Sequence, residues 1–228
     1  MTAQVPLPLP PLRARPVGFV VGSGNSDALS RIDAWRDAPR TRPLDWVMLL
    51  LGPPRGGKTT LLEHVAGSLG APVRGADLDI EAMLEGPARP VLVDDAQAFD
   101  PLDLFALIEG QAGRRALLLL AGTGRPEGWA GPKDRPLPDL LSRLRSVARA
   151  EVQPPDEEML TRLLAAEMTA RGFRPPLSAL AEAARGLRRE AEAPARLAAR
   201  CADLSARGYK KPAALLRDAL ASAPDLTL

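Results

Sequence analysis

Residues 52–59 read Gly-Pro-Pro-Arg-Gly-Gly-Lys-Thr, after a continuous apolar run over residues 46–51 and before a helical pattern over residues 59–69. Glycines let successive backbone N–H groups turn inward toward an anion, and the N-terminus of the following helix adds positive potential. The stretch predicts a phosphate-binding loop in which Lys58 reaches the terminal phosphates and Thr59 binds magnesium. The other predicted nucleotide-binding residues of the loop are Gly52, Gly57 and Thr60. The alternative is a glycine-rich turn that binds nothing, which would only weaken the fold.

Apolar runs and helical patterns alternate around this loop. A continuous apolar run that ends at glycine or proline is typical of a strand buried on both faces, as in a parallel sheet. The alternation therefore predicts an α/β fold, with a parallel sheet and crossover helices. The expected strands after the first cover residues 72–73, 90–93, 116–121 and 148–152, and the expected helices cover residues 59–69, 100–109 and 137–144.

The two ends of the chain differ from this central part. Residues 1–17 contain five prolines among leucines and arginines, which predicts an extended tail. Residues 19–21 then predict a short strand or extended segment, followed by a turn at residues 22–25 and a helix that includes Ala28 and Trp35.

Beyond Pro154 and Pro155 the strand pattern stops. An acidic first turn at residues 156–158 opens an apolar stripe of helical spacing, and glycines and prolines divide the rest of the chain into about four helices. We therefore expect three parts: an extended tail at residues 1–17, a nucleotide-binding α/β domain at residues 18–153, and a helical lid domain at residues 154–228.

Composition places the chain among ordinary globular proteins. Its 228 residues suit one domain with a small appendage, and 46% hydrophobic and 25% charged residues argue against wholesale disorder. A single cysteine excludes an intramolecular disulfide, and no apolar run approaches the roughly 20 residues that span a bilayer. The formal charge of +2 is too balanced to indicate a surface that coats nucleic acid. We expect a cytoplasmic protein without a membrane partner.

A second motif carries two carboxylates. Residues 91–95 read Val-Leu-Val-Asp-Asp, which predicts a buried strand whose acidic end lies at the edge of the sheet where ligands bind. Asp94 is suited to hold magnesium through water, and Asp95 to orient or deprotonate an attacking water. The alternative is a solvated acidic strand end.

Together with the phosphate loop, four short stretches resemble the AAA+ module of the bacterial initiator DnaA and, more closely, the short DnaA-related regulators of the Hda family. They are Phe-Val-Val-Gly-Ser-Gly-Asn at residues 19–25, Asp-Asp-Ala-Gln at 94–97, Thr-Gly-Arg-Pro at 123–126 and Ser-Arg at 142–143. The resemblance implies an AAA+ P-loop core followed by a helical lid, with ATP or ADP and Mg²⁺ as ligands. It assigns Phe19 and Asn25 to the adenine pocket and Thr123 to the γ-phosphate or attacking water. Arg143 would act across a subunit interface on a neighbour's nucleotide.

Two positions depart from the family pattern. Gly124 replaces the acidic or amide residue of the turn that follows Thr123, and Glu192 lies in the register of the lid arginine that contacts nucleotide in DnaA. Arg188, Arg189 and Arg196 are displaced candidates for that arginine. These departures predict slow hydrolysis by the isolated protein. The chain also lacks the helix-turn-helix domain of DnaA, so sequence-specific DNA binding is not expected.

The resemblance implies a regulator that promotes hydrolysis of DnaA-bound ATP together with the DNA polymerase sliding clamp, and so restrains replication initiation. Its partners would be DnaA, the clamp and, in an oligomer, further copies of the chain. One alternative is an autonomous P-loop enzyme, either a motor ATPase or a small nucleotide kinase. Another is a passive adaptor that nucleotide only stabilises.

The tail carries the predicted clamp contact. Residues 4–9 read Gln-Val-Pro-Leu-Pro-Leu and resemble the peptide by which Hda-like proteins dock on the sliding clamp. Gln4 would hydrogen-bond at the rim of a pocket, and Leu7 and Leu9 would fill an apolar groove. A proline-stiffened peptide loses less entropy on binding than a flexible one. The alternative is a Pro/Leu-rich tail without a partner.

Overall fold

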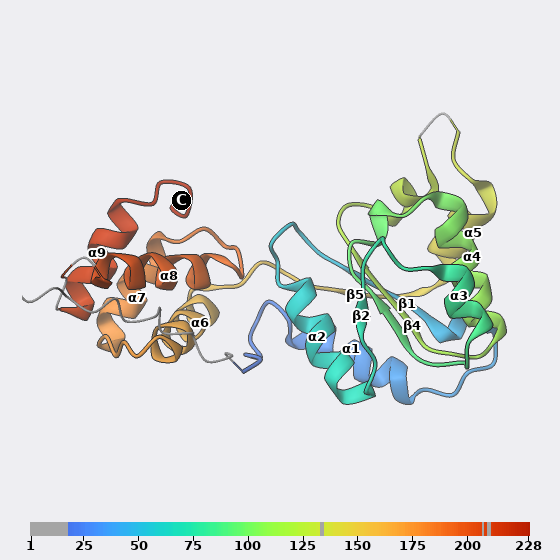
Figure 1. Ribbon diagram of the computed structural model, residues 1–228, viewed down its shortest axis with the longest axis horizontal. Helices are drawn as coiled ribbons and strands as arrows, with labels where there is room; N and C mark the ends of the chain where they lie inside the picture. The colour runs from blue at the N-terminus through green and yellow to red at the C-terminus, as the bar shows by residue number, and fades with distance from the viewer. Residues whose placement is uncertain (1–17, 133–134, 207, 209–210) are drawn as a thin grey trace, which may run out of the picture. The chain divides into compact units, whose positions relative to one another are not determined.

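The computed structural model describes residues 18–132, 135–206, 208 and 211–228, and these form two compact units (Figure 1). The larger unit comprises residues 21–159 and 189–192, and the smaller unit comprises residues 160–188 and 193–228 together with residues 18–20. The short segment 189–192 thus belongs with the larger unit, although it lies between two helices of the smaller one.

The larger unit is built on a five-stranded sheet in the order β2-β3-β4-β1-β5, and all neighbouring strands are parallel. The strands are β1 (Val47–Leu51), β2 (Val73–Arg74), β3 (Val91–Val93), β4 (Leu118–Gly122) and β5 (Ala148–Glu151). Because β1 and β4 lie in the interior of the sheet and are covered on both faces, their runs of apolar residues are almost fully buried. The predicted parallel α/β sheet is confirmed.

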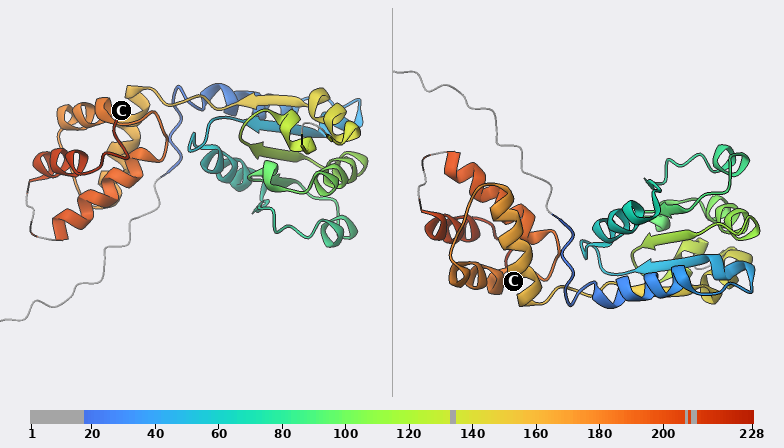
Figure 2. Two further views of the ribbon diagram at one scale, coloured as in Figure 1. Left: turned by 90° about the horizontal axis from the view of Figure 1, so that it is seen from above. Right: turned by 90° about the horizontal axis from the view of Figure 1, so that it is seen from below.

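Helices cover both faces of the sheet, as Figure 1 and the two views of Figure 2 show. Val47 and Leu49 of β1 share one apolar core with Leu104 of α4 and Leu140 of α5. The helices of this unit are α1 (Ser26–Asp37), α2 (Lys58–Leu69), α3 (Ile80–Glu85), α4 (Pro101–Gly113) and α5 (Pro138–Ser146), with single 3₁₀ turns η1 (Pro43–Trp46), η2 (Ala96–Ala98) and η3 (Pro126–Ala130). Residues 19–21 form neither a strand nor a helix.

Helix α3 was not anticipated, because six residues are too few to show a periodic pattern. It begins where the side chain of Asp79 accepts a hydrogen bond from the backbone N–H of Ala82. Asp100 caps α4 in the same way, with Pro101 in the first helical position.

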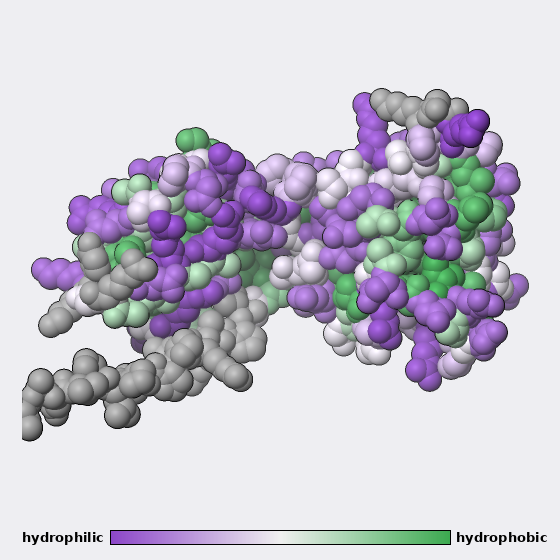
Figure 3. Space-filling model, turned by 45° about the horizontal axis from the view of Figure 1, so that its top comes forward, coloured by the Kyte–Doolittle hydropathy of each residue, from purple (hydrophilic) through white to green (hydrophobic). Residues whose placement is uncertain are grey.

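In its described residues, the smaller unit is a bundle of four helices, α6 (Glu157–Ala170), α7 (Leu177–Gly186), α8 (Ala193–Ala206) and α9 (Pro212–Ala221). Its core contains leucines from each helix, and Cys201 of α8 is buried among them. The predicted helical part after the sheet is therefore confirmed. Hydrophilic side chains cover much of the visible surface of each unit (Figure 3). Among the helices that the structure describes, none has the length and apolar character needed to cross a membrane.

Candidate nucleotide-binding site

The loop between β1 and α2 has the backbone geometry of an anion cradle. Gly57 adopts φ 93°, a left-handed conformation that a residue with a Cβ would adopt only under strain, and a Cβ there would also lie 3.1 Å from the Cβ of Ala191. Arg55 is also left-handed, with φ 56°. These two conformations turn the chain sharply before α2 begins at Lys58, so the N-terminus of α2 opens onto the loop.

Lys58 is the buried cation of this loop, with only 6% of the residue exposed. Its Nζ donates hydrogen bonds to the carbonyl oxygens of Pro53 (2.8 Å) and Gly52 (3.2 Å). Desolvation by burial lowers the pKa of Lys58 below its ordinary value of 10.5, and the negative charges of Asp94 and Asp95 oppose this lowering. An ammonium held in this way supplies a positive charge where phosphate oxygens would lie.

A hydroxyl and a carboxylate meet beside the loop. Thr59 Oγ1 donates to Asp94 Oδ2 at 2.5 Å, and Asp94 Oδ1 accepts the backbone N–H of Asp95 at 3.0 Å. Magnesium prefers oxygen ligands and takes few of them from the protein, since phosphates and waters complete its shell. Thr59 and Asp94 therefore fit a Mg²⁺ ion that arrives with a nucleotide. In residues 18–132, 135–206, 208 and 211–228, no group of three or more His, Cys, Asp or Glu residues is placed to hold a metal.

The side chain of Gln97, for which no role was predicted, links Asp95 to the end of β4. Gln97 donates from Nε2 to Asp95 Oδ1 at 3.0 Å and accepts the backbone N–H of Thr123 at Oε1, also at 3.0 Å. Trp129 donates its indole N–H to the carbonyl of Thr123 at 3.1 Å. A Cβ on Gly122 would lie 2.4 Å from Trp129 and 2.6 Å from Gln97, so glycine is required there. Gln97 thus fixes the relative position of the acidic motif and the Thr123 turn.

These elements enclose a pocket of about 270 Å³ in the larger unit. Most of the residues predicted to bind phosphate, magnesium or the attacking water line it, and so do two residues of the segment 189–192. The lining residues are residues 54–60, Asp94, Asp95, Thr123, Ala191 and Glu192. Gly52 contributes its carbonyl to Lys58 instead.

The two residues assigned to adenine do not line this pocket. Asn25 is 7% exposed, and its Oδ1 accepts the backbone N–H of Gly22 at 2.9 Å, which closes the turn that starts α1. Phe19 belongs to the other compact unit. Their contact with adenine stays a prediction.

Arg143 lies on α5 and does not line the phosphate pocket. Its Nε donates to Glu109 Oε1 of α4 at 2.8 Å, and its guanidinium carbon lies 5.3 Å from the centre of the Phe105 ring. The hydrogen bond to Glu109 raises the pKa of Arg143, so the guanidinium is charged throughout the physiological range.

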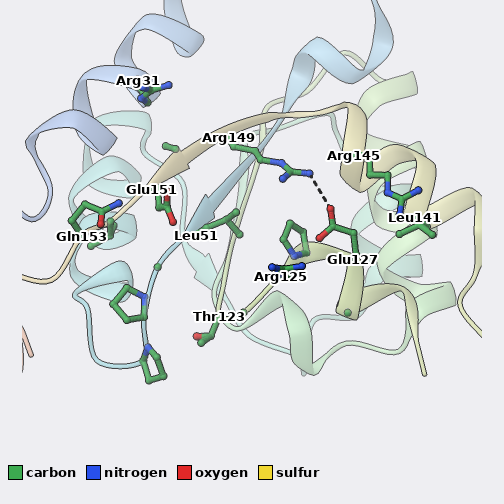
Figure 4. A pocket seen from close by; sticks show the side chains of 18 of the residues that line it. Arg31, Leu51, Thr123, Arg125, Glu127, Leu141, Arg145, Arg149, Glu151 and Gln153 are labelled. Atoms are coloured by element: carbon green, nitrogen blue, oxygen red, sulfur yellow. Dashed lines mark ion pairs between the residues drawn. The ribbon is translucent and has the colours of Figure 1, made fainter. Parts of the chain in front are cut away.

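A larger groove of about 1470 Å³ is lined by residues of β5, by Leu51 of β1 and by the segment that follows β4 (Figure 4). Four arginines line it, namely Arg31 of α1, Arg125 just before η3, Arg145 of α5 and Arg149 of β5. Arg149 pairs with Glu127 at 3.7 Å and Arg31 pairs with Asp27 at 2.7 Å, so acidic residues offset part of this charge. The sequence did not indicate this groove, because its residues come from separate elements.

The fold of this chain is similar to that of several solved proteins. Domain III of the replication initiation protein DnaA from Thermotoga maritima superposes with a TM-score of 0.65 and 20% identity, over 89% of this chain and 95% of that domain. The fold is that of an AAA+ P-loop ATPase. The Holliday junction branch migration motor RuvB of the same organism superposes with a TM-score of 0.64 and 19% identity, over 88% of this chain and 69% of RuvB. A DNA replication initiation factor superposes with a TM-score of 0.54 and 19% identity, over 71% of this chain and 56% of that protein.

Curated sequences give a shorter match. The shikimate kinases of Salinispora arenicola and Salinispora tropica are each 36% identical over 77 residues, which is 33% of this chain. The match spans 46% of the length of each kinase. No protein-family model matches the sequence.

Proposed function

We propose that this protein is a nucleotide-binding AAA+ regulator that promotes hydrolysis of the ATP bound to DnaA. The observation that carries the proposal is the position of Arg143, which is held on the face of α4 and α5 and is absent from the phosphate pocket of its own chain. An arginine placed in this way is suited to act on the nucleotide of a neighbour. The similarity to DnaA domain III, which covers most of both chains, makes a DnaA-like molecule a suitable neighbour.

The chain's own pocket would bind ATP or ADP with Mg²⁺. The backbone N–H groups of residues 55–57 would donate to phosphate oxygens, Lys58 would contribute its charge, and Thr59 with Asp94 would hold the ion. When bound, Mg²⁺ would neutralise charge on the phosphates. Asp95 is held by Gln97 at the side of the pocket, where it can accept a proton from water.

Hydrolysis by the protein alone should be slow. Gly124, which follows Thr123 at the pocket, brings no side chain that could orient a water or contact phosphate. An arginine supplied by a partner is worth about a thousandfold or more in the rate of phosphoryl transfer. We therefore expect the protein to stimulate its partner more than itself.

Docking on the sliding clamp through Gln4, Leu7 and Leu9 forms part of this proposal. These residues lie outside the described part of the chain. The test is binding of purified clamp to the full chain, to a Gln4→Ala/Leu7→Ala variant and to a chain that starts at Arg15. Unchanged affinity after removal of the tail would exclude clamp docking through this peptide.

The main experiment measures hydrolysis of ATP preloaded on DnaA, with and without this protein and the clamp. The wild type should accelerate hydrolysis and Arg143→Ala should not. The fold and the nucleotide affinity of Arg143→Ala should be those of the wild type. Arg217→Ala, which removes an exposed arginine on α9, is the matched control. Equal stimulation by wild type and Arg143→Ala would show that Arg143 is only a surface residue.

A second candidate is a small-molecule kinase, which the 36% identity to shikimate kinases over 77 residues favours. Production of ADP that depends on added shikimate, and not on DnaA, would support it. Against it, the helical unit of this chain follows the last strand of the sheet, whereas a kinase lid is expected between strands. Binding of nucleotide with no effect on DnaA and no phosphoryl transfer would indicate a passive adaptor.

A further inference from the structure

The segment 189–192 packs directly against the phosphate loop, although about 135 residues separate the two in sequence. The backbone N–H of Ala191 donates to the carbonyl of Arg55 at 2.9 Å, and the Cβ of Ala191 is the nearest atom to the space above Gly57. The side chain of Arg55 pairs with Glu190 at 3.3 Å and with Glu192 at 3.9 Å. One backbone hydrogen bond and two ion pairs therefore hold this segment at the rim of the loop.

The two glutamates differ in their relation to the pocket. Glu192 lines it together with Thr59, Asp94 and Asp95, whereas Glu190 does not. A single guanidinium faces both carboxylates, so the group of Arg55, Glu190 and Glu192 keeps a net charge of −1. Negative charge from this group thus remains at the pocket.

We propose that Glu192 is a specificity-determining residue that weakens binding of a nucleoside triphosphate relative to a diphosphate. The proposal rests on the proposed nucleotide-binding function. A triphosphate brings one more phosphate group, and more negative charge, to this pocket than a diphosphate does. Like charges at short range disfavour one another, and the penalty is larger for the more highly charged ligand.

The penalty is modest because the side chains concerned are half exposed. The Glu192 side chain is 59% exposed and that of Arg55 is 50% exposed, so water screens the repulsion. We expect Glu192→Gln to lower the ratio of the dissociation constant for ATP to that for ADP by about threefold at low salt. This size is in line with the interaction energies of similarly exposed ion pairs. Raising the ionic strength should reduce the difference between the variant and the wild type.

The experiment is competitive displacement of a fluorescent ADP analogue by ATP and by ADP, each with Mg²⁺, from the full chain. Glu190→Gln is the matched control, because it also removes a partner of Arg55 but lies outside the pocket. The proposal expects a larger fall of the ratio in Glu192→Gln than in Glu190→Gln, because only Glu192 lines the pocket.

Two results would overturn the proposal alone. The first is an unchanged ratio in Glu192→Gln, and the second is an equal fall in both variants, which would assign the effect to release of Arg55. Failure of the wild type to bind either nucleotide would overturn the proposed nucleotide-binding function as well, so the two failures are distinguishable.

Discussion

Thr59 and Asp94 are 35 positions apart in sequence, and the hydroxyl of the first donates a 2.5 Å hydrogen bond to the carboxylate of the second. The contact exists because β1 and β3 run parallel with only β4 between them, which brings the segments that follow both strands to the same edge of the sheet.

A magnesium site at this edge needs the oxygens of both Thr59 and Asp94. Asp94→Asn should therefore weaken binding of ATP with Mg²⁺ and leave binding of ATP without Mg²⁺ largely unchanged. Titration calorimetry in both conditions tests this, with the exposed Asp218→Asn of α9 as control.

Lys58 should decide whether nucleotide stabilises the fold. Ligand present at about 100 times its dissociation constant adds about 2.7 kcal/mol to the free energy of unfolding. ADP or ATP with Mg²⁺ should therefore raise the melting temperature of the wild type by a few degrees and leave that of Lys58→Ala unchanged. Equal shifts in the two proteins, measured by thermal denaturation, would contradict the assignment of this loop.

Glu109 should act through Arg143. It accepts a hydrogen bond from Nε and so orients the guanidinium, and a fixed orientation favours the forked contact with phosphate that suits arginine. Glu109→Gln should lower stimulation of DnaA's ATPase several-fold without changing affinity for DnaA, because the loosened arginine still reaches the interface.

The free energy of unfolding should change by no more than about 1 kcal/mol in this variant, since the pair is partly exposed. Arg143→Lys should stimulate DnaA's ATPase no better than Arg143→Ala does, because an ammonium cannot form the forked contact. Stimulation by Glu109→Gln at the wild-type rate would remove Glu109 from the mechanism.

Cys201 should report on the integrity of the helical unit. Burial raises the pKa of its thiol from 9.0 to about 12, so the reactive thiolate is scarce at neutral pH in the folded protein. Reaction with a thiol reagent should be slow in the native state and fast in urea.

The same shift gives a pH dependence of stability. Because the pKa of Cys201 is raised on folding, its contribution to stability is fully present below pH 9 and is lost as the pH rises from 9.0 toward about 12. The fall in the free energy of unfolding over this range should be smaller in Cys201→Ala. An equal fall in both proteins would assign the loss to other groups.

The sequence by itself determined the elements whose signals lie in one continuous stretch. The apolar run, glycine-rich loop and helix over residues 46–69 follow from local burial, backbone freedom and helix polarity, and the structure places β1 and α2 on either side of that loop. The four helices after Pro155 follow from breaker residues in the same way. Helix α3 was missed because its six residues make fewer than two helical turns, which is too short for a periodic pattern to show.

Only the tertiary structure decided which side chains meet. Gln97 joins Asp95 to the Thr123 turn, Glu109 holds Arg143 and the segment 189–192 packs on Arg55, and each of these contacts joins residues from different elements. Periodicity fixes which face of an element is buried, but a contact between elements depends on strand order, register and the angle at which helices pack. These quantities arise when the whole core closes, so no local pattern in the sequence contains them.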